Sequence, residues 1–273
     1  MVAHNIAKNA ALSAAPLSAL RNAKAILLDW DGCVMIGERI TSAAQAFIQR
    51  HAERIVILSN NSTHVPNDFA QALARADAPV PVERIVLAGV EAVNWASQNA
   101  AGRVMLFGST QIKRHARQIG LDLVRDEPDA ILLTRDARFT YAKLHRAINA
   151  LREGARLIVA NSDTTHPGAK QQLVPETGAL MAALLACVPD AQVVTIGKPG
   201  PLLFEKACAI AGILPHEAVM IGDNPLTDGQ GALDFGITPI LIGPHGDVSL
   251  DDLVAMDGPP APRSPLTASI RIV

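Results

Sequence analysis

Short aliphatic runs separated by helix-length segments limit what this chain can fold into more than any other feature. The runs are rich in Ile, Val and Leu and cover residues 25–28, 54–58, 104–107, 130–133, 157–160, 193–196, 218–221 and 238–242. Continuous apolar runs of this length are typical of strands buried on both faces of a parallel sheet. Their alternation with helical patterns predicts an α/β fold.

Two of the intervening segments carry clear helix boundaries. Residues 140–153 repeat apolar side chains at helical spacing and end before Gly154. Residues 201–211 start with proline, which suits the first turn of a helix, and are followed by Gly212, which suits a C-terminal cap. We therefore predict a helix over each segment.

Charge and composition exclude several functional classes. The chain has 24 basic and 26 acidic residues and a net charge of −2, so it lacks the basic surface of a nucleic-acid-binding protein. Its longest apolar run covers residues 179–188, whereas a membrane-spanning helix needs about 20 residues. The three cysteines form no CxxC pair, which favours a reduced, cytoplasmic protein without a disulfide framework.

Two familiar phosphate-binding motifs are incomplete. Gly197–Lys198 would belong to a P-loop only with glycine five residues earlier and serine or threonine after it, but Gln192 and Pro199 occupy those positions. Gly229–Gly231 would belong to a dinucleotide fingerprint only with a third glycine at position 234, which is Asp234. The sequence therefore does not favour nicotinamide or nucleoside-triphosphate chemistry.

Polar groups follow four of the predicted strands. They are Asp29-Trp30-Asp31-Gly32, Ser59-Asn60-Asn61-Ser62, Gly197-Lys198-Pro199, and Gly222-Asp223-Asn224 with Asp228 shortly after. In an open α/β sheet, ligands bind at the carboxyl ends of the strands. If the four strands are neighbours, these groups converge on one site.

The chemistry of such a site is limited. Clustered carboxylates repel one another unless a cation lies among them, and hard oxygen ligands suit Mg²⁺. A lysine and a hydroxyl beside the cation suit a phosphate group. One carboxylate can then attack phosphorus to form an aspartyl-phosphate. A second carboxylic acid can protonate the leaving oxygen and later deprotonate water.

The four motifs, in this order, resemble those of haloacid dehalogenase superfamily phosphatases, and more closely those of the NagD-like subfamily IIA. Residues 139–144, 154–158 and 161–163 also match that subfamily, and the resemblance covers about residues 24–245. It implies a Rossmann-like, doubly wound parallel sheet with an inserted α/β cap domain. It also implies a Mg²⁺ cofactor and is compatible with homodimers.

The resemblance assigns roles to the acidic residues. Asp29 is expected to be the nucleophile and a metal ligand. Asp31 is expected to be the general acid and base, and to offer its main-chain carbonyl to the metal. Asp223 is the third expected ligand. Asp228 and Asn224 are expected to lie around the metal site without binding the metal directly.

The same resemblance assigns the phosphate contacts. Ser59 and Asn60 are expected to hold phosphate oxygens, and Lys198 is expected to neutralise both the phosphate and Asp29. Gly32 permits a sharp backbone turn, so that a peptide N–H can meet the phosphate.

Spacing predicts the cap independently. Only 23 positions separate Asp31 from Arg54, whereas 139 separate Ser59 from Lys198. One or two crossover units of about 30 residues would suffice for the second interval. We therefore expect a first core segment over residues 1–85, a cap over 86–190 and a second core segment over 191–273. This last segment includes a Pro-rich tail at 258–265, which we expect to be extended.

Caps exclude water and contact the substrate. The candidate cap contacts are Arg135, Asp136, Asp163 and His166. A further helix is expected to open at residues 176–178 and to point toward the site.

These features predict a Mg²⁺-dependent phosphomonoester hydrolase. Its substrate is expected to be a small phosphorylated metabolite of the sugar phosphate, nucleotide, phosphoglycolate or pyridoxal phosphate class. Two alternatives remain at this point. The same core could pass the phosphoryl group to a sugar hydroxyl, as a phosphotransferase or mutase does, or it could serve as a non-catalytic binding protein.

Overall fold

The computed structural model describes residues 15–37, 39–99, 102–167, 172–246 and 248–256. Residues 15–22 are helical. The expectations for the first residues of the chain and for the Pro-rich tail at 258–265 lie outside the described residues. Within the described ranges, no helix is long and apolar enough to cross a membrane.

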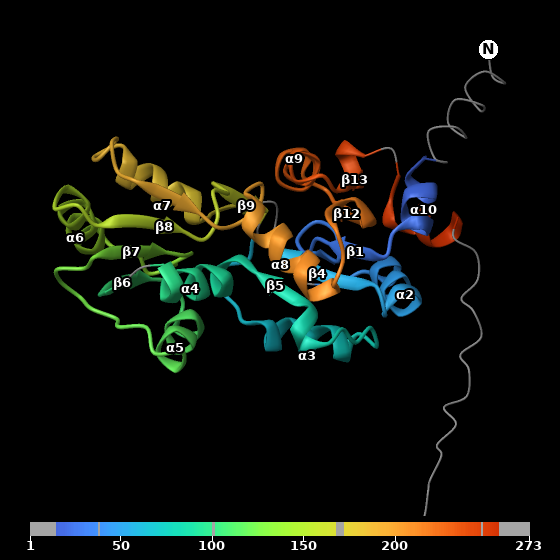
Figure 1. Cartoon of the computed structure of the whole chain (residues 1–273), viewed down its shortest axis with the longest axis horizontal. Coiled ribbons are helices and arrows are strands. Elements are labelled where there is room, and N and C mark those ends of the chain that lie inside the picture. Colours follow the sequence, from blue (N-terminus) through green and yellow to red (C-terminus); the bar gives the residue numbers. More distant parts are fainter. Residues whose placement is uncertain (1–14, 38, 100–101, 168–171, 247, 257–273) are drawn as a thin grey trace, which may run out of the picture.

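Strands and helices alternate along the chain. The strands are β1 Ala25–Leu28, β2 Met35–Ile36, β3 Arg39–Ile40, β4 Ile55–Ser59, β5 Ile85–Leu87, β6 Val104–Phe107, β7 Ala130–Leu133, β8 Arg156–Val159, β9 Thr165–Pro167, β10 Leu173–Pro175, β11 Val193–Thr195, β12 Ala218–Gly222 and β13 Thr238–Leu241. The helices are α2 Ser42–His51, α3 Pro66–Arg75, α4 Ala88–Asn99, α5 Thr110–Gln118, α6 Tyr141–Arg152, α7 Thr177–Leu185, α8 Pro201–Ala211, α9 Gly231–Phe235 and α10 Leu250–Met256. Figure 1 shows two layered units arranged along the long axis of the molecule.

The larger unit is built on a parallel sheet. Among the described residues this sheet has five strands in the order β13-β12-β1-β4-β5, and all its neighbours are parallel. Every residue of β1, β4 and β12 is buried. Helices cover both faces, with Phe47 of α2 and Leu253 of α10 on one side and Phe204 of α8 on the other. The predicted α/β core with a doubly covered parallel sheet is confirmed.

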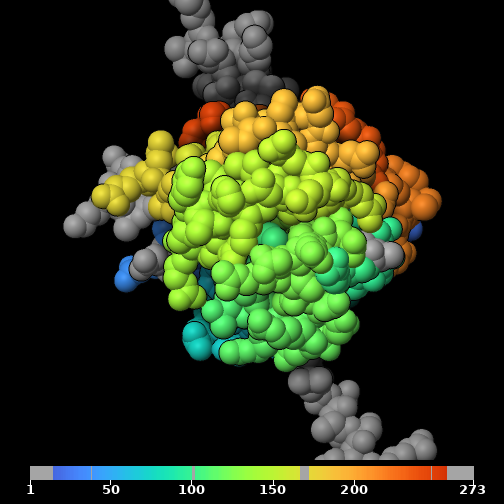
Figure 2. Space-filling model, turned by 90° about the vertical axis from the view of Figure 1, so that its left-hand side faces the viewer, coloured from blue at the N-terminus to red at the C-terminus, as the bar shows by residue number. Residues whose placement is uncertain are grey.

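The second unit repeats this layering on a smaller scale. Within the described ranges its sheet has four parallel strands in the order β11-β8-β7-β6. Leu151 of α6 and Leu184 of α7 pack on one face, and Val93 of α4 and Ile112 of α5 pack on the other. Figure 2 looks onto this end of the molecule, where green to yellow residues form the visible surface.

The expected position of the strand before Lys198 is wrong. Residues 193–196 were predicted to be a strand of the core sheet, but β11 pairs with β8 at the edge of the second sheet. One edge of the core sheet is formed by β5, a strand that the aliphatic runs did not predict. An apolar run shows that a strand is buried, but not which of two parallel sheets it joins. The expected cap limits of 86–190 consequently separate β11 from its own sheet and cut through β5.

Candidate active site

Three of the four polar motifs meet because their strands are neighbours. β1 lies between β12 and β4, so Asp29, Asp223 and Ser59 stand at adjacent strand ends. The Asp29 N–H donates to Ile221 O at 2.9 Å, which fixes the start of the first motif beside β12. The predicted convergence of these motifs is confirmed.

Lys198 reaches the same place from the second sheet. The side chain of Asn60 makes two hydrogen bonds to the backbone of Lys198. Asn60 Oδ1 accepts from Lys198 N at 2.8 Å, and Asn60 Nδ2 donates to Lys198 O at 2.9 Å. A Cβ at position 197 would lie 2.6 Å from Asn60 Oδ1, so this close approach requires Gly197. The side chain of Asn60 therefore positions Lys198.

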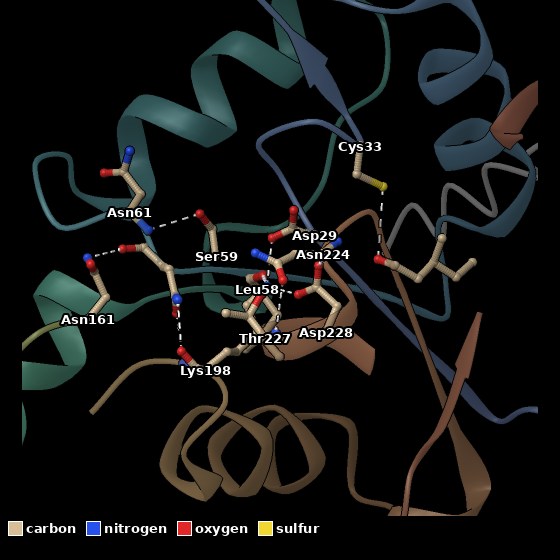
Figure 3. Close-up of polar contacts among 12 residues, drawn as sticks. Asp29, Cys33, Leu58, Ser59, Asn61, Asn161, Lys198, Asn224, Thr227 and Asp228 are labelled. Atoms are coloured by element: carbon tan, nitrogen blue, oxygen red, sulfur yellow. Dashed lines mark hydrogen bonds and ion pairs between the residues drawn. The ribbon is translucent and has the colours of Figure 1, made fainter. Parts of the chain in front are cut away.

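The Lys198 ammonium lies between two buried carboxylates. Its Nζ is 2.6 Å from Asp29 Oδ1, 2.6 Å from Asp228 Oδ1 and 3.0 Å from Leu58 O (Figure 3). Burial opposes the charge of Lys198, but the carboxylates of Asp228 and Asp29 outweigh it and raise the pKa of the lysine. Lys198 is therefore a permanent cation beside Asp29.

Three acidic side chains form a cluster that could hold a further cation. Asp29, Asp223 and Asp228 each bring a carboxylate oxygen within 4.8 Å of the other two. Burial raises the pKa values of Asp29 and Asp223, because buried negative charges lack hydration. A Cβ on Gly32 would lie 2.3 Å from Asp223 Oδ2, so glycine leaves room for this carboxylate. Clustered carboxylate oxygens of this kind fit Mg²⁺.

The loop after β12 is held by its own polar groups. Asp228 is 1 % exposed and accepts a hydrogen bond from the Asn224 N–H at 3.1 Å, in addition to its contact with Lys198. The Asn224 side chain accepts from the N–H groups of Leu226 and Thr227 at 2.9 and 3.3 Å. Asn224 thus caps the single helical turn at Pro225–Gln230 that presents Asp228.

Asp31 and Gly32 lie in the turn after β1. Burial raises the pKa of Asp31, although interactions with His166 and Lys198 partly oppose this. A raised pKa suits a carboxyl group that must donate a proton. Gly32 has a φ of +82°, and its N–H donates to Met35 O at 2.9 Å. Gly32 therefore shapes the turn but does not direct its own N–H into the cleft.

The residues described above open into one cleft of about 320 Å³. Among the described residues, every side chain that lines it is polar. The lining residues are Asp29, Asp31, Ser59, Asn60, Asn61, His64, Arg135, Asp163, Thr165, His166, Glu176, Lys198, Asp223, Asn224, Thr227 and Asp228.

Three of the four expected cap contacts reach the cleft. Arg135, Asp163 and His166 line it, whereas Asp136 does not. The Asp136 carboxylate lies 2.6 Å from Lys143 Nζ and caps the turn that follows β7. The charge of Asp136 is thus paired with a lysine only seven residues away, which accounts for its burial outside the cleft.

Other lining residues were not proposed as site residues from the sequence. Glu176 was expected only to open a helix, and it does cap α7. Asn61 and His64 follow β4 and were not assigned a role. The signal for Asn61 was its place in the Ser-Asn-Asn-Ser motif, where its side chain accepts from the N–H groups of Thr63 and His64 at 3.0 Å.

The loop after β4 also joins the two units of the molecule. Asn60 Nδ2 donates to Asp163 Oδ2 at 3.0 Å, and Asn161 Nδ2 donates to Asn60 O at 2.7 Å. Two buried hydroxyls, Ser62 Oγ and Thr177 Oγ1, lie 3.0 Å apart. The smaller unit is thus hydrogen-bonded to the motif that carries the phosphate-binding candidates.

The chain is similar to known proteins over most of its length. The family model for haloacid dehalogenase-like hydrolases matches residues 23–236. A dihydroxyacetone phosphatase of Corynebacterium glutamicum (strain R) is 28% identical over 220 residues, which are 79% of either chain. The 5'-nucleotidase YutF of Bacillus subtilis (strain 168) is 28% identical over 227 residues, 82% of this chain and 88% of that one.

A solved structure shares the fold. The crystal structure of a glycerol phosphate phosphatase from Mycobacterium tuberculosis in complex with magnesium superposes with a TM-score of 0.73 at 26% sequence identity. The likeness covers 81% of this chain and 68% of that one. It therefore includes strands of both sheets of the present chain.

Proposed function

The chain belongs to the haloacid dehalogenase-like hydrolases, and we propose that it is a Mg²⁺-dependent phosphatase of small phosphorylated metabolites. The observation that carries the proposal is the buried Asp29–Lys198–Asp228 triad beside Asp223, in which Asp29 and Asp223 stand at the carboxyl ends of adjacent strands. This arrangement places a candidate nucleophile, a fixed positive charge and a cation pocket in one polar cleft. Relatives named as phosphatases and a nucleotidase support the same reaction class.

In the proposed site, Mg²⁺ would be held by the carboxylates of Asp29 and Asp223 and by the main-chain carbonyl of Asp31. Asp228 lies close enough to support this cluster. When bound, the ion neutralises the carboxylates and the phosphate oxygens, which lowers the barrier to attack by an anion. A magnesium complex of the similar glycerol phosphate phosphatase supports this choice of metal.

The proposed reaction has two chemical steps. In the first, a carboxylate oxygen of Asp29 attacks phosphorus, the bond to the leaving oxygen breaks, and Asp31 gives its proton to that oxygen. In the second, Asp31 takes a proton from a water molecule whose oxygen attacks the phosphorus, and the bond between phosphorus and the Asp29 oxygen breaks, which releases phosphate and restores the Asp29 carboxylate. Ser59 and Asn60 bind phosphate oxygens, and Lys198 keeps Asp29 oriented toward the phosphorus.

We further propose that the smaller unit, from α4 to β11, is a cap over the cleft. Arg135, His166 and Glu176 come from this unit and line the cleft together with Asp29. A cap of this kind limits the access of water and contacts the leaving group. The three free cysteines of the chain support a reducing, cytoplasmic location.

Phosphate release tests the proposal. The wild type is expected to hydrolyse p-nitrophenyl phosphate with Mg²⁺, to lose this activity in EDTA, and to regain it when Mg²⁺ is restored. Asp29→Asn is expected to lose at least about 10³-fold in kcat, the scale seen when a covalent nucleophile is removed. Asp251→Asn, which changes an exposed carboxylate of α10, is the matched control.

Two results would contradict the proposal. One is turnover that persists in EDTA, and the other is an Asp29→Asn variant within about tenfold of the control. Measurement of free inorganic phosphate against transferred phosphate also separates hydrolysis from phosphotransfer to a sugar hydroxyl.

A further inference from the structure

Three side chains of the smaller unit form a contact group at the mouth of the cleft. Arg135 follows β7, His166 lies in β9 and Glu176 caps α7. Figure 1 shows β9 between the two sheets. Glu176 Oε1 lies 2.7 Å from His166 Nδ1 and 3.5 Å from Arg135 Nε. The glutamate therefore contacts two side chains, each of which comes from a different part of the smaller unit.

Within this group, a carboxylate lies next to a guanidinium of opposite charge. The Glu176 side chain is 14% exposed, and it faces the only guanidinium among the described lining residues of the cleft, that of Arg135. The Glu176 carboxylate offsets the Arg135 guanidinium, and Asp163 adds a negative charge to the same cleft. A carboxylate or a second phosphate on the substrate gains no net attraction from such a group.

Hydrogen-bonding groups nevertheless face the cleft. The Glu176 carboxylate faces Nε of Arg135 and Nδ1 of His166 at ion-pair distance, which leaves the Nη groups of Arg135 and Nε2 of His166 without an ion-pair partner among the described residues. Both side chains are part-exposed, at 27% and 34%. Guanidinium and imidazole nitrogens of this kind suit hydroxyl oxygens.

We propose that Arg135, His166 and Glu176 form a charge-balanced subsite that binds the hydroxyl groups of a phosphorylated polyol or small sugar. Arg135 and His166 contact the leaving group, and Glu176 is the positioning residue that orients them. The inference rests on the phosphatase activity proposed above and names the substrate class of that same cleft.

Substrate selection tests the subsite. The full chain with Mg²⁺ is compared on glycerol 1-phosphate and on phosphoglycolate, which carries a carboxylate in place of hydroxyl groups. The wild type is expected to favour glycerol 1-phosphate in kcat/KM by about tenfold or more. Glu176→Gln unmasks the Arg135 charge and is expected to shift the ratio toward phosphoglycolate by about tenfold or more, mainly through KM. A smaller preference or a smaller shift overturns the proposal.

Two further variants test the charge of Glu176 and the substrate contact of His166 separately from any effect on folding. Glu176→Asp keeps the negative charge and is expected to shift the ratio by less than tenfold; an equal shift to that of Glu176→Gln overturns the role of charge. His166→Asn is expected to raise KM for glycerol 1-phosphate about fivefold or more, the effect of one lost hydrogen bond, and a smaller rise overturns its contact. His145→Asn, in an exposed position of α6, is the control.

Hydrolysis of p-nitrophenyl phosphate distinguishes a failure of the proposed phosphatase activity from a failure of the proposed subsite. This substrate has no hydroxyl group on its leaving group, so it reports the phosphatase reaction without the subsite. A wild type inactive on it and on both other substrates refutes the proposed function. A wild type active on it, with an unchanged substrate ratio in Glu176→Gln, refutes the subsite alone.

Discussion

Lys198 determines whether the carboxylates of the site can be buried together. Its ammonium is the cation that contacts both Asp29 and Asp228 among the described residues, and all three side chains are nearly inaccessible to solvent. Removal of one partner from a buried ion pair typically costs about 3–5 kcal/mol, because an uncompensated charge remains. The lysine therefore supports the fold as well as the reaction.

Lys198→Met is expected to lower the free energy of unfolding by about 3–5 kcal/mol in EDTA and to abolish phosphatase activity. Urea denaturation followed by circular dichroism measures the first effect. Lys206→Met, on the exposed side of α8, removes a lysine without a buried partner and is expected to stay within about 0.5 kcal/mol of the wild type. Equal urea midpoints for the two variants would contradict this role of Lys198.

Alanine substitutions at Gly32 and Gly37 distinguish the effect of backbone strain from that of a steric clash with Asp223. Both have positive φ, +82° and +64°, so alanine at either position costs about 1–2 kcal/mol. Only at Gly32 would the new Cβ meet Asp223, at 2.3 Å from Oδ2; at Gly37, apart from the chain neighbours, no atom of the described part of the chain would lie within 4 Å of it.

Gly32→Ala is therefore expected to displace Asp223 and to lower kcat about 10²-fold or more, whereas Gly37→Ala keeps nearly full activity. A displacement of about 1 Å in a catalytic group has effects of that size. The measurement is kcat at saturating substrate over a Mg²⁺ titration. If both variants lose the same activity, steric contact with Asp223 is not the cause.

At the residue scale, the sequence identified Asp29, Ser59 and Asp223 as neighbours because each lies at the carboxyl end of a strand of the same parallel sheet. It could not identify the contact of Glu176 with His166. That contact depends on β9 pairing with β10 in a register that sets His166 opposite Val174 and brings the cap residue of α7 alongside. Such a pairing of strands of three residues each leaves no periodic signal in the chain.

At the scale of elements, the loop after β4 joins the core to α7. Ser62 Oγ lies 3.0 Å from Thr177 Oγ1 and accepts from the Arg135 N–H at 3.0 Å, and both hydroxyl side chains are buried. A buried polar group that loses its partner costs about 1–3 kcal/mol. These contacts therefore fix the start of α7, and with it Glu176, relative to the phosphate-binding motif.

A double-mutant cycle measures this link. Ser62→Ala leaves the Thr177 hydroxyl and the Arg135 N–H without their partner and is expected to destabilise the protein by about 1–3 kcal/mol. Thr177→Val has a similar shape without the hydroxyl, so Ser62→Ala in that background should cost less, with a coupling of at least about 0.5 kcal/mol. Urea denaturation of the four proteins gives the value. Additive effects would show that the two hydroxyls do not interact.

The elements themselves were predictable to different degrees. Helix α8 has the predicted bounds, because Pro201 and Gly212 mark its ends and Gly212 adopts a φ of +67°. β11 was found but placed in the wrong sheet, since its partner β8 is chosen by the packing of the smaller unit. β5 was missed because residues 85–87 form a short strand that runs directly into α4.

At the scale of the whole molecule, one hydrophobic cluster connects the two sheets. It includes Leu27 and Val56 from the core sheet, Leu106 and Leu132 from the second sheet, and Phe204 from α8. The spacing of motifs could predict an inserted unit, but not that this unit would share a core with the sheet that carries the site. A shared core predicts that the two units unfold together.

The two tryptophans of the chain test this cooperativity, because they report on different regions. Trp30 is buried in the core, where its ring centroid lies 4.1 Å from that of Phe69. Trp95 lies in α4 and packs against the shared cluster. In Trp95→Phe and Trp30→Phe, each with one remaining tryptophan, the fluorescence midpoint in urea is expected to coincide with the circular dichroism midpoint of the same variant. A fluorescence transition clearly separated from the circular dichroism transition in either variant would show that the smaller unit unfolds independently.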